Sequence, residues 1–163
     1  MGKEEYEDIT EVINEIANDI NSILDDCEKE KYFECIVLLY SFIENLLKWL
    51  VFIKLLWEKF DNPISEAEIK TIRSFAKDLR FHDVLRLSYS IKLIDFKLFK
   101  RLDKIKEERN NVIHQYWLYT HRKDKRVLRK KLEKLASTAN SLIGIFNKLT
   151  EEVGVDEVYQ IFL

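Results

Sequence analysis

The sequence predicts an all-α protein, an up-and-down bundle of about five helices. Among its 163 residues are only three Gly and one Pro, so it has little of the turn chemistry that a sheet protein needs between strands. Hydrophobic residues make up 47% of the chain and recur at spacings of three and four, the pattern of helices with one buried face. The length fits one domain and no linker divides it, so we expect a single domain over residues 1–163.

The first two expected helices differ in how much of their surface is apolar. Residues 4–25 carry one apolar stripe with acids on the outer face, which is typical of a packing helix. Residues 29–60 form the most apolar segment, with one polar strip made of Glu34, Ser41, Glu44, Asn45 and Lys48. Glu44, Lys48 and Lys54 would each cost about 2.5–3.5 kcal/mol inside a bilayer, so we expect no membrane span. A helix this apolar is expected at the centre of a bundle or at a subunit interface.

Local signals mark where the later helices begin. Ser65 and Glu68 form a capping box, which predicts a helix to about residue 79. A short helical piece over 83–90 should follow, with His82 as a partly exposed cap residue. Asp95 is expected to cap a helix that ends near residue 118.

The last expected helix begins after a basic loop and is capped by Asp124. Its apolar residues alternate at spacings of four and three, which predicts a seam like that of a coiled coil: Leu128, Leu132, Leu135, Ala139, Leu142, Phe146 and Leu149. Gly144 interrupts this helix at modest cost.

Charge is distributed unevenly although the net charge is only -2. Residues 1–30 carry eleven acids and two lysines, whereas residues 97–134 carry fourteen Lys and Arg against five acids. The basic block favours a polyanionic partner, with RNA the natural candidate. The alternative is an exposed helix face balanced by the acidic first helix.

The cysteine content and the N-terminus bear on the compartment. Cys27 and Cys35 lie eight residues apart without a Cys-x-x-Cys pattern, so neither a disulfide nor a metal framework is expected. The N-terminus is acidic and shows no signal peptide. Together these features favour the cytoplasm.

Residues 108–116 are the most informative stretch for function. The expected helix over 95–118 has a core stripe of Leu98, Leu102, Ile105, Val112 and Tyr116, and the slot between Ile105 and Val112 holds Arg109. An arginine facing a core is costly unless it is paired, so Arg109 implies a partner, a ligand or an interface. Five residues later comes His114, the side-chain type whose ordinary pKa lies near neutrality.

The sequence Arg109-Asn110-x-x-x-His114 resembles the Arg-x(4–6)-His signature of the HEPN superfamily, small all-helical domains found in many prokaryotic RNA-cleaving toxins and defence proteins. The resemblance covers about residues 81–119 and implies a HEPN-like bundle that cleaves RNA without a metal. It also implies a homodimer in which two motifs meet in one basic cleft. With Tyr116 the pattern is similar to HEPN toxins paired with a nucleotidyltransferase antitoxin that transfers AMP to the tyrosine.

The resemblance assigns roles to the motif residues. His114 would act as base or acid in attack by the ribose 2′-hydroxyl, and Arg109 would stabilise the charge that develops on phosphorus. Asn110 lies four residues before His114 and would orient its imidazole. Tyr116 would position the phosphate or a base, and Glu44 resembles an acid often found mid-helix in the family. The cations expected to bind RNA are Lys106, Arg122, Lys123 and Arg126.

Several alternatives remain open at this point. Arg109 and His114 would otherwise be a buried hydrogen-bonding pair near a helix end, Glu44 an exposed member of the polar strip, and Tyr116 a core anchor. The domain would otherwise be a catalytically silent HEPN module that binds a nucleotide or a protein, or a helical adaptor that packs through residues 29–60. No cofactor is expected, and the three histidines lack metal-ligand spacing.

Overall fold

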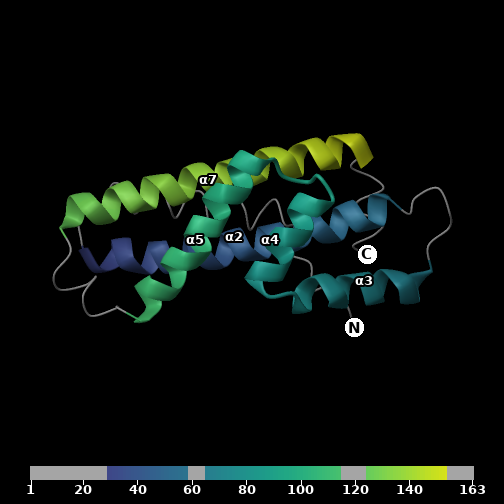
Figure 1. Ribbon diagram of the computed structural model, residues 1–163, viewed down its shortest axis with the longest axis horizontal. Helices are drawn as coiled ribbons and strands as arrows, with labels where there is room; N and C mark the ends of the chain where they lie inside the picture. Colours follow the sequence, from purple (N-terminus) through teal and green to yellow (C-terminus); the bar gives the residue numbers. More distant parts are fainter. Residues whose placement is uncertain (1–28, 59–64, 115–123, 154–163) are drawn as a thin grey trace, which may run out of the picture.

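The computed structural model describes residues 29–58, 65–114 and 124–153 (Figure 1). The described part is an all-α bundle of five helices with no strand: α2 (Lys29–Trp57), α3 (Glu66–Asp78), α4 (Phe81–Ser90), α5 (Phe96–His114) and α7 (Lys125–Val153). The predicted fold class is therefore confirmed. The helix expected over 4–25 lies outside the described residues, as do residues 115–118 at the expected end of α5.

Helix α2 is the centre of the bundle and contacts each of the other four helices, α7 most extensively. The two long helices run in the same direction, because the Lys125 ammonium at the start of α7 lies 5.8 Å from the ring centroid of Tyr32 near the start of α2. Helix α3 runs back along α2, and α4 and α5 cross the long pair (Figure 1). This arrangement packs α5 against both α2 and α7.

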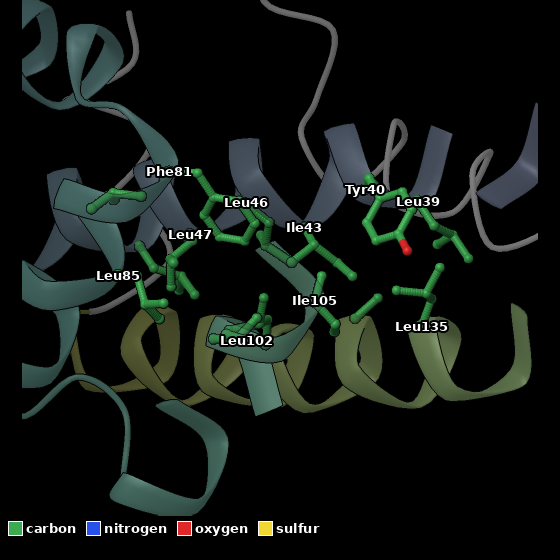
Figure 2. Packing of buried hydrophobic residues seen from close by; sticks show 14 of the residues in the cluster. Leu39, Tyr40, Ile43, Leu46, Leu47, Phe81, Leu85, Leu102, Ile105 and Leu135 are labelled. Carbon is green, nitrogen blue, oxygen red and sulfur yellow. The ribbon is translucent and has the colours of Figure 1, made fainter. Parts of the chain in front are cut away.

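The core lies where these helices meet. Leu102 and Ile105 of α5 are fully buried and point toward α2 residues such as Ile43 (Figure 2). Burial of a side chain of this size contributes about 1.5–3 kcal/mol, so this layer fixes how α5 is rotated about its axis. Every residue of the predicted α7 seam is buried, as expected.

The predicted caps are mostly confirmed. Ser65 and Glu68 form both bonds of the capping box at the start of α3. The Asp95 carboxylate accepts from the Leu98 N–H at 2.7 Å, and the Asp124 carboxylate accepts from the Arg126 N–H at 2.9 Å.

The start of α4 differs from the prediction. This helix begins at Phe81 with Arg80 as its N-cap residue, so the assignment of His82 as a cap is wrong. Phe81 is buried in the core, and its packing extends the helix two residues ahead of the expected Asp83. His82 is therefore an exposed residue of the first turn.

Within the described residues, one helix segment, Lys31–Trp57, is long and apolar enough to cross a membrane by length and composition alone. The core helix of a soluble protein passes the same test, and 56% of the most apolar window of this segment is buried inside the bundle. Glu44, Lys48 and Lys54, the charged residues in its middle and last turns, all have partners in the structure. Glu44 pairs with Arg109 and Lys48, and Lys54 pairs with Glu58 at 3.5 Å.

Candidate functional site

Arg109 occupies the predicted gap in the core stripe of α5. Its neighbours on that stripe, Ile105 and Val112, are fully buried, and Tyr116 lies outside the described residues. The Arg109 guanidinium reaches across to α2 and donates through Nη1 to Oε2 of Glu44. The Arg109 side chain is 33% exposed and that of Glu44 is 14% exposed. The cost of placing an arginine on this stripe is thus offset by a carboxylate 65 residues earlier in the chain.

Glu44 holds two cations at once. Its Oε2 accepts from Arg109, while its Oε1 lies 3.2 Å from the Lys48 ammonium one turn further along α2. The Lys48 ammonium also donates to the Lys77 carbonyl of α3 at 3.1 Å. The alternative that Glu44 is merely an exposed residue of the polar strip is wrong, because its side chain is covered and pairs with Arg109 of α5 and with Lys48. Two cations around one carboxylate leave this cluster with a net positive charge.

The Arg109 guanidinium is anchored at one nitrogen. Arginine has five N–H donors in a rigid plane. Within the described part of the chain, the Arg109 guanidinium hydrogen-bonds only to Glu44. The remaining donors can therefore take an anion such as a phosphate without breaking the bond to Glu44. Such charge-assisted bonds are the strong class of hydrogen bond in proteins.

The neighbouring residue, Glu108, ties α5 to α7. Its carboxylate oxygens lie 3.0 Å from the Lys131 ammonium and 3.6 Å from that of Lys134. Partial burial raises the pKa of Glu108, but the hydrogen bonds and charges of the two lysines outweigh it and hold that pKa below its usual range. Arg109 is thus fixed between one ion-pair cluster on α2 and another on α7.

The other predicted site residues have different placements. Asn110 is exposed on α5. His114 is the last residue of α5, five residues after Arg109, but its side chain lies outside the described residues, as do Tyr116, Arg122 and Lys123. The structure therefore brings Arg109 and Glu44 together and leaves the Asn110–His114 pairing as a prediction.

The two remaining predicted RNA-binding cations differ in their surroundings. The Lys106 ammonium is bound to the Asp103 carboxylate at 2.5 Å and lies 3.4 Å from Nδ1 of His82. The carboxylate therefore partly neutralises its charge. Arg126 is exposed in the first turn of α7. Arg126 thus keeps its charge directed to solvent, whereas Lys106 is a weaker candidate for RNA.

A groove of about 460 Å³ between α2 and α3 adjoins the Glu44 cluster through Lys48. Its wall on α3 carries Lys70, Arg73 and Lys77, its wall on α2 carries Trp49, and none of the described residues that line it is an acid. The Arg73 guanidinium lies 5.6 Å from the Trp49 ring centroid. These α3 cations were missed in the sequence, although their spacing at i, i+3 and i+7 places them on one helix face.

No group of three or more His, Cys, Asp or Glu is placed to hold a metal ion within the part of the chain that the structure describes. No protein-family model, curated protein or solved structure matches the chain. The function of this chain therefore has to be inferred from its own residues.

Proposed function

We propose that this protein is a metal-independent endoribonuclease of the HEPN type, which acts in the cytoplasm as a toxin or defence effector. The observation that carries the proposal is the placement of Arg109. Its guanidinium is half-buried on the helix that ends at His114, is anchored by Glu44 at one nitrogen, and has further donors directed to no other described residue.

The proposed reaction needs a base, an acid and cations. The base removes the proton of a ribose 2′-hydroxyl, whose oxygen attacks the adjacent phosphorus, and the acid protonates the leaving 5′-oxygen. His114 supplies one of these groups. Arg109 donates to the phosphate oxygens as negative charge builds up on them, and its bond to Glu44 keeps the guanidinium oriented before the substrate arrives. The required 2′-hydroxyl restricts the reaction to RNA.

A single motif supplies only one acid–base group, so we propose that two chains form a two-fold dimer. In this dimer, Arg109 and His114 of both chains face one basic groove, and one histidine acts as base while the other acts as acid. A nucleotidyltransferase antitoxin that modifies Tyr116 is the proposed inhibitory partner. Light scattering at micromolar concentration checks the dimer, because a monomer under these conditions would contradict the two-histidine site.

Cleavage assays on structured RNA in the presence of EDTA test the activity with matched controls. His114→Ala and Arg109→Ala should each abolish cleavage while leaving the far-ultraviolet circular dichroism unchanged. His82→Ala is the histidine control. Arg129→Ala is the arginine control, since Arg129 pairs with Glu133 at 3.2 Å on the exposed face of α7. Equal activity in all four variants would refute the assignment.

The alternative is a catalytically silent module that binds a nucleotide or a protein. The ion pair with Glu44 favours this alternative, because it gives Arg109 a structural role that needs no substrate. In that case, RNA would remain intact with the unmodified protein, and Arg109→Ala would change only the free energy of unfolding. Measuring both quantities on the same variant separates the two functions.

A further inference from the structure

Three aromatic rings gather at the turn between α4 and α5, where Phe99 packs against the edge of the core and Tyr89 and Phe96 are exposed. The Tyr89 ring centroid lies 6.0 Å from that of Phe96 and 5.2 Å from that of Phe99. The Phe96 and Phe99 rings are stacked with an interplanar angle of 8°. Tyr89 is 45% exposed and Phe96 is 53% exposed, and both are among the few large hydrophobic residues left in solvent. We call Tyr89, Phe96 and Phe99 the aromatic platform.

The residues that flank the aromatic platform in the sequence are rich in cations. Residues 89–104 contain Lys92, Lys97, Lys100, Arg101 and Lys104 against two acids. The Lys100 ammonium lies 4.7 Å from the Phe96 ring centroid. Both acids are engaged within the protein, since Asp95 caps α5 and Asp103 binds Lys106. The platform therefore combines exposed aromatic faces with positive charge that no nearby carboxylate fully balances.

The turn that forms the platform has a costly residue in it. Lys92 has a φ of 55°, in the left-handed region, and follows Ile91, the C-cap residue of α4. The Leu93 N–H bonds to the Ser88 carbonyl at 2.9 Å, which closes a Schellman turn at a position that favours glycine. A lysine there costs stability and has no ion pair among the described residues. Backbone strain of this kind clusters at functional sites.

We propose that the aromatic platform binds single-stranded RNA, with bases stacked on Tyr89 and Phe96 and phosphates held by the surrounding lysines. Aromatic rings and a basic track are the two elements that single-strand binding requires. A protein partner fits less well, because lysine is depleted at protein–protein interfaces and four of the five cations here are lysines.

The platform also suggests which RNA reaches the proposed nuclease site, an extension that rests on the proposed function. Phe96 and Arg109 are thirteen residues apart on α5, or about 20 Å along the helix axis. That distance corresponds to roughly six nucleotides of a stacked strand, which is a lower bound because Phe96 and Arg109 lie on different faces of α5. The substrate would then be a single-stranded segment held at the platform and cut at least about six nucleotides away.

Binding of a fluorescent twelve-nucleotide single-stranded RNA tests the proposal by anisotropy. The probe is 2′-O-methylated throughout, so it cannot be cleaved by 2′-hydroxyl attack and reports binding whether or not the protein is a nuclease. Tyr89→Ala and Phe96→Ala should each weaken binding by between about fivefold and about 100-fold. Phe75→Ala is the matched control, because Phe75 is 51% exposed on α3 and belongs to no ring cluster in the described residues.

Two further variants separate stacking from apolar contact. Phe96→Leu keeps apolar bulk but has no aromatic face, so it should bind as weakly as Phe96→Ala, whereas Phe96→Trp should retain the affinity. Lys97→Gln and Lys100→Gln should each reduce the slope of log affinity against log salt by about 0.7, while Lys148→Gln on α7 should not.

Unchanged RNA affinity in Tyr89→Ala and Phe96→Ala would overturn the platform. Full RNA affinity in Phe96→Leu would also overturn it. If the variants lost binding only to vesicles of anionic phospholipid, the platform would be a membrane-binding surface instead. The outcome is independent of the nuclease proposal. If the protein cleaves RNA and the platform variants bind RNA as well as the unmodified protein does, only the platform proposal is refuted. If the protein does not cleave RNA but its RNA binding depends on the platform, only the nuclease proposal is refuted.

Discussion

The ion pair between Glu44 and Arg109 is measurable apart from any activity. A double-mutant cycle with Glu44→Gln, Arg109→Met and the double variant removes each charge while keeping similar side-chain volume. Exposed pairs contribute 0–1 kcal/mol, whereas breaking a fully buried pair costs about 3–5 kcal/mol. With side-chain exposures of 14% and 33%, this pair lies between those limits, and Lys48 shares the carboxylate. We expect a coupling free energy of about 1–2 kcal/mol.

Urea unfolding followed by circular dichroism gives the four free energies of unfolding. Arg109→Met should destabilise less than Glu44→Gln, because Lys48 still neutralises Glu44 after the arginine is lost. Removing the charge of Glu44 instead leaves Lys48 and Arg109 facing each other without a carboxylate between them. For a chain of 163 residues, 1 kcal/mol corresponds to about 2–4 °C in Tm, so thermal unfolding provides a second check.

A coupling free energy of zero within error would refute the inference that Glu44 fixes the Arg109 guanidinium. Equal losses in the two single variants would contradict the role given to Lys48. The matched cycle on Arg129 and Glu133, both half-exposed on α7, should give no more than about 0.5 kcal/mol.

Three further predictions follow from single sites. Gly144→Ala should raise the free energy of unfolding by about 1 kcal/mol in urea, because an added Cβ meets nothing within 4 Å and alanine favours the helix; a loss of stability would mean that α7 is not helical there. Lys92→Gly should raise Tm by relieving the left-handed backbone while weakening RNA binding; a lower Tm would contradict the Schellman turn. Glu108→Gln should lower stability by less than about 1 kcal/mol at pH 7. Because the folded-state pKa of Glu108 is depressed, that difference should shrink as the pH falls from the ordinary value of 4.5 through the folded-state pKa, and a difference that does not shrink over this acid range would show that charge is not the cause.

The elements that could be predicted from the sequence depend on short-range interactions. The capping box at Ser65 and the caps at Asp95 and Asp124 are set within three residues of each cap, so local patterns suffice. The α7 seam is likewise fixed by helical periodicity, and all of its residues are buried. Helical periodicity also predicted that Arg109 interrupts the apolar stripe of α5.

The identity of the Arg109 partner could not be predicted, because it depends on how two distant helices are rotated against each other. Glu44 lies on a strip with exposed Ser41 and Asn45, so its helix alone favours exposure. Only the packing of α5 across that strip covers the carboxylate. The aromatic platform was missed for a similar reason, since it forms when a turn closed by a lysine brings Tyr89 next to Phe96.

Mass analysis of the RNA products formed in EDTA is the most direct test of the central claim. Attack by the 2′-hydroxyl predicts fragments that end in a 2′,3′-cyclic phosphate and begin with a free 5′-hydroxyl. Their rate of formation should fall by at least about 10²–10⁴-fold in His114→Ala and should be unchanged in His82→Ala. Fragments that carry a 5′-phosphate, cleavage that requires magnesium, or cleavage that survives His114→Ala would contradict the account.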